Sequence, residues 1–353
     1  MKSVVPITLP ITLPITIMQP SNAGQKATKV TVTDYQESYL VSECEDDPEI
    51  AALLPKNYRA QHCEFIINNV SNSIANGLRR TLSNELYTLA MIADFPAIKT
   101  TDLFHIQEML IKRLRLIPLD QDCPIDAQFE LDVSNTSADL IDITSAQITR
   151  LNPSGGRAAN PKKLPFNETF TICTLGSARA LKISPITVVR RQGDERGDGM
   201  HVIACNTASA AVDVKPIDLF NPENGGVSSS MANPRVYRIK FNTNGTWPPK
   251  RIVTAACDNI IARCKAVMGH IHNIKNEGDQ YELSMMETDT IGNTMMQMIN
   301  KLYPNIKYVT YSSDENVKSI WIRIRCDEDI NEVYTSAVDA LVNVYEQIKT
   351  YFI

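Results

Sequence analysis

The chain has 353 residues, a formal net charge of -5, 43% hydrophobic residues and 21% charged residues. This composition is ordinary for a globular protein, and the length allows two or three domains with substantial cores. The acidic balance argues against independent binding to nucleic acid, which usually requires a basic face.

The N-terminal segment contains an unusual apolar stretch. Residues 4–18 repeat a Pro-Ile-Thr-Leu pattern, with prolines at positions 6, 10 and 14. Because proline removes a backbone donor and disfavours a helix, a signal peptide or membrane span is the weaker interpretation. The pattern favours an extended or disordered N-terminal arm over residues 1–60, which a partner could hold in place.

The segment after the arm predicts a strand followed by an amphipathic helix. Residues 63–70 are rich in apolar and aromatic side chains, which indicates a strand. Ser71–Ser73 offer N-caps for a helix that we expect to continue to about Thr88. Its apolar residues recur at helical spacing and form one stripe: Ile74, Leu78, Leu82, Leu86 and Leu89.

A second strand and helix are predicted before residue 119. The strand spans about 89–99, and the helix begins at Thr101 or Asp102 and stops at Pro118. Its apolar residues face one way: Leu103, Ile106, Leu110 and Leu114. Basic residues lie near its C-terminal end, where cations interact favourably with the helix dipole: Lys112, Arg113 and Arg115.

Residues 120–233 differ in character and predict an inserted, mostly β domain. Alternating apolar and polar residues at 127–133 are typical of a half-buried strand. Further strand-like runs are separated by loops rich in Gly, Pro and Asn: 139–151, 169–174, 181–190, 200–205 and 210–214. The loop GDERGDG at 193–199 lacks the ending of a phosphate-binding loop and is interpreted as a hairpin tip.

Two long helices in the last third of the chain carry apolar residues at heptad spacing. A strand at 235–244 precedes the first helix, which begins after Pro248–Pro249. Its spaced apolar residues are Val253, Cys257, Ile260, Cys264, Val267, Ile271 and Ile274. Those of the final helix, which begins near residue 329, are Tyr334, Ala337, Leu341, Val344, Ile348 and Tyr351. Such surfaces are most simply buried against each other.

Between these helices the chain repeats its first strand-and-helix unit. We expect a strand at 281–286, a helix at about 289–302, and strands near 306–311 and 318–325. An alignment that sets residue 71 on residue 288 matches SNSIAN with TDTIGN and keeps the apolar helix positions in phase. Chance could supply the short match, but it is less able to supply the same architecture around both copies.

These segments resemble the alpha-type subunits of cellular RNA polymerases. The run FIINNVSNSIANGLRRTLSNEL, with QEMLIKRLRLIPL at 107–119, is similar to the larger alpha-type polypeptide: the bacterial alpha N-terminal domain, the archaeal D polypeptide and the third subunit of eukaryotic polymerase II. The run METDTIGNTMMQMI at 286–299 resembles the smaller one, the archaeal L polypeptide and the eleventh subunit of polymerase II. The fusion resembles that of nucleocytoplasmic large DNA viruses, notably the asfarvirus-like group.

The resemblance implies an α+β fold in which the alpha-type RNA polymerase dimerisation fold occurs twice, as an intrachain pseudodimer. It implies a larger-subunit-like domain at 61–119 and 234–275, an inserted mostly β domain at 120–233, and a smaller-subunit-like domain at 281–353. The expected pseudodimer interface is formed by Ile74, Leu78, Leu82, Val253, Ile260, Val267, Ile271, Ile291, Gly292, Asn293, Met295, Ile299, Leu341, Val344 and Ile348.

The implied function is a non-catalytic assembly platform of a multisubunit DNA-dependent RNA polymerase. Its implied partners are the two largest, catalytic subunits and small subunits resembling the tenth and twelfth of polymerase II, with no membrane partner. The viral resemblance implies transcription of viral genes in the host cytoplasm and packaging in the virion. The implied large-subunit contacts are Asn76, Arg79, Arg80, Lys112 and Arg113. Arg79 and Arg80 lie off the apolar stripe, so they either reach a partner or are merely solvated.

Catalytic, cofactor and metal sites are not expected. The eight cysteines include no Cys-x-x-Cys pair, and scattered single thiols suit a reducing, intracellular compartment. His270 and His272 are two apart on a predicted helix and therefore point in different directions. The alternative interpretation is an unrelated protein-interaction scaffold, or an enzyme without a recognisable motif, in which the repeat is accidental.

Overall fold

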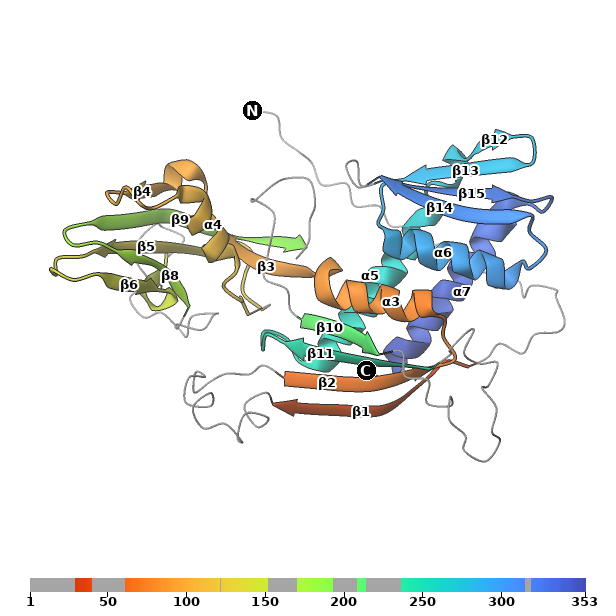
Figure 1. Ribbon diagram of the computed structural model, residues 1–353, viewed down its shortest axis with the longest axis horizontal. Coiled ribbons are helices and arrows are strands. Elements are labelled where there is room, and N and C mark those ends of the chain that lie inside the picture. The colour runs from red at the N-terminus through yellow and green to blue at the C-terminus, as the bar shows by residue number, and fades with distance from the viewer. Residues whose placement is uncertain are drawn as a thin grey trace.

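The computed structural model describes residues 29–39, 61–120, 122–151, 170–192, 208–213, 236–314 and 319–353. These residues form a larger and a smaller lobe, each around its own hydrophobic core (Figure 1). The larger lobe has two four-stranded antiparallel sheets with helices between them. Among the described residues, no helix is long and apolar enough to cross a membrane.

The first sheet of the larger lobe has the strand order β1-β2-β11-β10. Its strands are β1 (Thr31–Tyr39), β2 (Gln61–Asn68), β10 (Ala208–Asp213) and β11 (Val236–Thr243). In β2 every second residue turns inward, so Cys63, Phe65 and Ile67 are buried in the core. Helix α3 (Asn72–Arg80) and a π-helical turn (Thr81–Glu85) follow β2, and α5 (Pro249–Met268) follows β11.

The second sheet has the order β12-β13-β15-β14. Its strands are β12 (Lys275–Glu277), β13 (Gln280–Met285), β14 (Tyr308–Asp314) and β15 (Ser319–Arg325). Helix α6 (Asp289–Leu302) follows β13, and α7 (Ile330–Thr350) follows β15. The first unit (β1, β2, α3, β10, β11, α5) and the second unit (β12, β13, α6, β14, β15, α7) therefore share one chain order and one sheet order.

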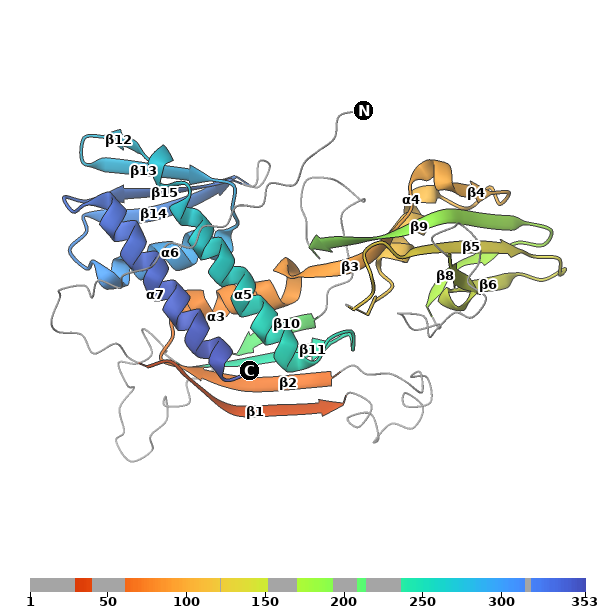
Figure 2. The same cartoon turned by 180° about the vertical axis from the view of Figure 1, so that it is seen from behind.

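Helices α5 and α7 lie side by side and antiparallel, because each leaves one sheet and ends at the other (Figure 2). Lys349 Nζ contacts Asp258 Oδ1 at 2.6 Å across this pair. Beyond α7, the ring of Phe352 packs edge-to-face on Phe65 of β2 and Tyr35 of β1, with centroid distances of 5.0 and 5.5 Å. The end of the second unit is thereby anchored on the first sheet.

The smaller lobe is formed by described residues between 87 and 192. Its main sheet has the order β3-β9-β5-β7, with β4 also paired to β9, and β6 pairs with β8 in a separate sheet. The strands are β3 (Tyr87–Ile92), β4 (Ile98–Thr100), β5 (Gln128–Ser134), β6 (Ile141–Thr144), β7 (Ile148–Arg150), β8 (Thr171–Leu175) and β9 (Ala180–Gln192). Helix α4 (Gln107–Arg115) packs against β3 and β8.

Several predicted elements are confirmed with small shifts at their ends. The predicted helix at 289–302 is α6, whose N-cap Thr288 accepts a hydrogen bond from the Thr290 amide at 3.3 Å. The strands predicted at 127–133, 235–244 and 281–286 correspond to β5, β11 and β13. The run at 139–151 is instead split into β6 and β7 by a 3-10 turn.

The predicted domain boundary at residue 119 is wrong. Leu86 lies in the core of the larger lobe, but Leu89 and residues beyond it lie in the core of the smaller lobe. The reason is that β3 pairs with β9, and α4 buries Leu110 and Leu114 against that sheet. Helix α4 also starts later than predicted, at Gln107, and leaves Leu103 exposed.

Two strands of the first sheet were expected elsewhere. β10 pairs with β11 rather than with strands of the predicted insert at 120–233. β1 belongs to the predicted arm at 1–60, but it pairs with β2, and its flanking Val30 donates its amide to Gln347 Oε1 at 2.9 Å. The apolar stretch at 4–18, the strand predicted at 200–205 and the loop at 193–199 lie outside the described residues.

The first heptad helix is shorter than predicted. α5 ends at Met268, so Ile271 and Ile274 follow the helix and are only partly buried. The predicted domains at 234–275 and 281–353 meet in a β-hairpin formed by β12 and β13, with Gly278 at φ +72° in its turn. The second unit therefore begins at β12, before the predicted boundary at residue 281.

The heptad positions of the final helix are partly wrong. Val344 is half-buried and Tyr351 is 46% exposed, whereas Tyr345, which was not predicted, is fully buried. An α-helix has 3.6 residues per turn, so a straight helix drifts away from a strict seven-residue repeat. The inward face of α7 accordingly passes from Leu341 to Tyr345 and Ile348.

Candidate functional site

Most of the residues expected at the pseudodimer interface lie together in the core of the larger lobe. Those that are nearly or fully buried are Ile74, Leu78, Leu82, Val253, Ile260, Val267, Ile291, Met295, Ile299, Leu341 and Ile348. Ile271 and Val344 are at the edge of this core, and Asn293 is half-buried. Gly292 is different, because it packs under Tyr311 of its own unit: a Cβ there would lie 2.8 Å from Tyr311 Cδ2.

Helix α3 approaches α6 and α7 most closely at Gly77. A Cβ at this position would lie 3.1 Å from Tyr345 Oη and 3.3 Å from Thr294 Cγ2. The Tyr345 hydroxyl donates to the carbonyl oxygen of Ile74 at 3.3 Å. Gly77 is therefore a residue that sequence reasoning missed, because its role depends on side chains more than 200 positions away.

A buried polar network centred on Arg263 also connects the two units. Arg263 of α5 contacts Glu85 Oε2 and Glu287 Oε2, each at 2.6 Å, and its Nη2 donates to Thr288 Oγ1 at 2.6 Å. Glu85 lies in the first unit, directly before β3, whereas Glu287 and Thr288 precede α6. One guanidinium therefore bridges carboxylates of both units at the N-terminus of α6.

The charge on Glu85 is fully compensated in this network. The hydroxyls of Thr290 and Thr81 donate to its carboxylate at 2.6 and 3.0 Å. Burial raises the pKa of Glu85, but the charge of Arg263 and these hydrogen bonds outweigh it and hold the pKa below the ordinary value. Because the carboxylate stays ionised and paired, the network fixes how α3, α5 and α6 meet.

The expected large-subunit contacts on α3 differ from one another in their surroundings. Arg79 Nε donates to Asn76 Oδ1 at 3.0 Å, and both side chains are half-buried on the surface of α3. Arg80 Nε lies 3.7 Å from Glu85, and its Nη1 lies 4.0 Å from Asp289 of α6. Arg80 is therefore engaged at the contact between the two units, whereas Arg79 pairs with Asn76 on its own helix.

The other two expected contacts are in the smaller lobe. Lys112 and Arg113 lie on α4, and Arg113 Nη1 donates to the Thr171 carbonyl oxygen at 3.3 Å. Helices α3 and α4 are in different lobes (Figure 1). The five expected contact residues therefore form two separate surfaces rather than one.

Metal-binding and nucleophilic groups are not gathered in the described part of the chain. No cluster of three or more His, Cys, Asp or Glu residues suited to a metal ion is found there. Burial raises the pKa of Cys63 and of Cys264 to about 12, so both thiols stay protonated. The contacts between α3, α5, α6 and α7 are apolar packing, hydrogen bonds and ion pairs.

Comparison with known proteins decides the family. Residues 64–264 match the family model described as the RNA polymerase Rpb3/Rpb11 dimerisation domain. The chain belongs to this family. The chain is a fused alpha-type RNA polymerase subunit, and no catalytic role is indicated for it. The family match also removes the alternative interpretation of an unrelated protein-interaction scaffold.

Relatives of this RNA polymerase subunit are named DNA-directed RNA polymerase RPB3-11 homologs of African swine fever virus. A Kenyan pig isolate has a homolog that is 24% identical over 313 residues, covering 79% of this chain and 84% of the relative. The homolog of a Malawian tick isolate is 24% identical over 311 residues, covering 80% and 84%. The similarity thus extends beyond the family match into the second unit.

Proposed function

We propose that this RNA polymerase subunit is a non-catalytic assembly platform, built as an intrachain pseudodimer, that binds the two largest subunits of the polymerase. The observation that carries the proposal is the topology shared by the two units, which have one chain order and one sheet order. Each unit has its pairing partner in the same polypeptide, at an effective concentration of roughly millimolar or more.

The crossing of α3 and α6 supports the pseudodimer. In the alignment that sets residue 71 on residue 288, Gly77 corresponds to Thr294. These two residues face each other at the crossing, where a Cβ on Gly77 would lie 3.3 Å from Thr294 Cγ2. Equivalent residues meet in this way near the axis of a twofold interface. We assign residues 29–86 and 208–268 to the larger-subunit-like half, 87–192 to the insert and 275–353 to the smaller-subunit-like half.

The names of the relatives support a viral setting for this platform. These relatives belong to African swine fever virus. The proposal therefore includes transcription of viral genes in the host cytoplasm and packaging in the virion. It also includes docking of small subunits that resemble the tenth and twelfth of polymerase II.

Arg79 provides the direct test of large-subunit binding. The change Arg79→Glu reverses an accessible charge on α3, whereas Arg80 is left intact because it contacts Glu85 and Asp289 in its own chain. Loss of a charged interface contact costs about 2 kcal/mol or more, which is roughly thirtyfold in affinity. We expect affinity purification of the tagged variant to recover the chain folded, with strongly reduced amounts of the two largest subunits.

A matched control is Lys301→Glu, which reverses an exposed charge on α6. This variant should recover the large subunits at the wild-type level. Equal recovery with Arg79→Glu would remove Arg79 from the contact surface. Purification of the wild-type chain without either large subunit would refute the platform itself.

A further inference from the structure

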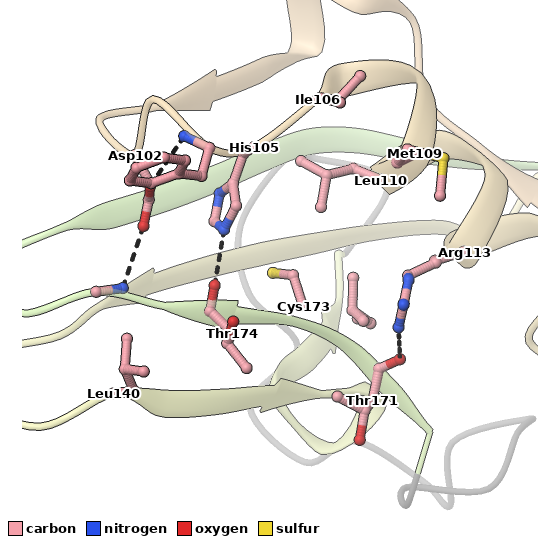
Figure 3. A pocket seen from close by; sticks show the side chains of 13 residues that line it. Asp102, His105, Ile106, Met109, Leu110, Arg113, Leu140, Thr171, Cys173 and Thr174 are labelled. Carbon is pink, nitrogen blue, oxygen red and sulfur yellow. Dashed lines mark hydrogen bonds between the residues drawn. The ribbon is translucent and has the colours of Figure 1, made fainter.

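A groove on the smaller lobe includes Arg113, one of the two expected contact residues on α4. It lies between β8 and α4 with the loop that precedes α4, and its volume is about 620 Å³ (Figure 3). Large apolar side chains line it from three segments: Phe104 and Ile106 in the loop, Met109 on α4 and Leu140 before β6. The groove is therefore apolar along most of its length.

The apolar residues of the groove are unusually accessible. Phe104 is 93% exposed, Leu140 is 74% exposed and Ile106 is 61% exposed. Exposed hydrophobic residues that occur singly are normal, but a contiguous group around a concave surface marks an interaction site. In a loop without fixed contacts, large apolar side chains would turn inward, away from water. The exposed conformation of this loop therefore has a structural cause.

Polar contacts hold the loop open. The Asp102 carboxylate accepts the backbone amides of Phe104 and Gly176, each at 3.1 Å. His105 bridges the Thr100 hydroxyl at 3.0 Å and the Thr174 carbonyl oxygen at 2.8 Å. The loop is thereby tied to β8 and to the turn after it (Figure 3), and Phe104 and Ile106 are among the residues that line the groove. The site is formed before any partner binds.

The charge of the groove indicates the chemistry of its occupant. Arg113 is exposed at the end opposite Asp102, and its contact with the Thr171 carbonyl uses one of five guanidinium donors. Among the described residues that line the groove, Asp102 is the one acid, and its carboxylate already accepts two backbone amides. A matching segment therefore presents large apolar side chains and a carboxylate that reaches Arg113.

We propose that this groove binds an apolar segment with an acidic residue at one end, contributed by another subunit of the polymerase. The proposal rests on the platform function proposed above and specifies the chemistry of the segment that the α4 surface binds. The apolar N-terminal segment of this chain does not have the required chemistry, because residues 1–28 contain no Asp or Glu. That segment therefore cannot supply the carboxylate for Arg113.

Site-specific photocrosslinking in the purified polymerase tests the proposal. A photoreactive amino acid replaces Leu140 at the groove, and in a control protein it replaces Met286, which is 77% exposed in the larger lobe. We expect position 140 to crosslink to another subunit, at a peptide with an Asp or Glu beside apolar residues. Adding Arg113→Glu should reduce this crosslink at least about tenfold. Adding Lys99→Glu, at an exposed site on the same lobe, should not.

Several outcomes would overturn the proposal. A crosslink from position 140 to a second copy of this chain, or to any other segment of its own chain, would assign the groove to a different occupant. An absent crosslink, or one that Arg113→Glu leaves unchanged, would also reject it. If the two largest subunits are present in such a preparation, the platform function stands although the groove proposal falls. If they are missing, both fall.

Discussion

At the scale of single residues, the charged groups at the junction of the units matter more than the exposed ones. Arg263 is held by Glu85 and Glu287 with little solvent around any of the three. A buried pair adds little net stability compared with apolar packing, but removing one member leaves an uncompensated charge. The network is therefore a sensitive point of the fold.

The change Arg263→Met should destabilise the protein by about 3–5 kcal/mol, because two buried carboxylates lose their cation. Denaturant unfolding followed by circular dichroism measures the loss. Arg251→Met is the matched control on the same helix, since its partner Asp122 is largely exposed and the pair is 3.3 Å apart. That change should cost less than about 1 kcal/mol. Equal effects would mean that the Arg263 network is not buried in solution.

The pH dependence of stability should report on Glu85. Because its folded pKa lies below the ordinary value of 4.5, its ionised form stabilises the fold above about pH 4.5. This contribution is lost as pH falls through the lower, folded pKa. Wild type should therefore exceed Glu85→Gln in stability at pH 7, and the difference should shrink below about pH 4.5. A difference that stays constant down to pH 3 would contradict the assigned charge state.

At the scale of elements, close helix approach and helical periodicity determine how the two units meet. α3 approaches α6 and α7 at Gly77, where an added Cβ would lie 3.1 Å from Tyr345 Oη and 3.3 Å from Thr294 Cγ2. α7 turns a 3.6-residue face inward rather than a heptad face. Substitutions at Gly77 test the close approach, and substitutions at Leu341 and Val344 test the periodicity.

The change Gly77→Val should weaken the crossing of α3 with α6. Its side chain would meet Tyr345 and Thr294, and overpacking of this kind costs about 1–3 kcal/mol. Gln297→Val adds the same side chain on the exposed face of α6 and serves as the control. Thermal unfolding should show a lower midpoint for the first variant only. A Gly77→Val protein as stable as the control would mean that the helices are farther apart.

Aspartate substitutions distinguish the two periodicities of α7. Leu341→Asp places a charge at a fully buried position and should cost about 4 kcal/mol or more. Val344→Asp should cost clearly less, because that side chain is half-buried at the edge of the core. The heptad interpretation predicts equal effects instead. Urea unfolding of both variants, or their soluble yield, decides between these expectations.

At the scale of the whole molecule, the chain has two cores connected through few segments. β3 leaves the larger lobe directly after Leu86, and the smaller lobe is built around β5 and β9. Lobes with separate cores open independently when one of them is weakened. We therefore expect the proposed contact surfaces on α3 and α4 to lie on bodies that unfold separately.

Phe129→Ala and Phe241→Ala form a matched pair for this expectation, since both rings are nearly fully buried, one in each lobe. Each change should cost about 3–5 kcal/mol. In hydrogen exchange followed by mass spectrometry, Phe129→Ala should accelerate exchange in β5 and β9 but not in α5 and α7. Phe241→Ala should do the reverse. Accelerated exchange throughout both lobes in either variant would show one cooperative unit.

The local elements and the internal repeat could be predicted from the residues along the chain. Side-chain periodicity predicted α6 with the bounds observed, and the match of 71–76 with 288–293 predicted two similar units. The resemblance carried by those runs agrees with the family match. These signals succeed because they depend on residues close together in the chain.

The pairing of strands at the sheet edges and the contacts between units depend on the folded chain as a whole. β1 and β10 pair with β2 and β11, which pair with each other although the smaller lobe separates them in the chain, and Glu85 meets Arg263 across 178 positions. A Cβ on Gly77 would lie 3.1 Å from Tyr345 Oη, so this position favours a small residue. The groove beside α4 exists because Asp102 and His105 tie its loop to β8. Periodicity tells which face of an element is buried, but not against what, because the partner is selected by the packing of the whole chain.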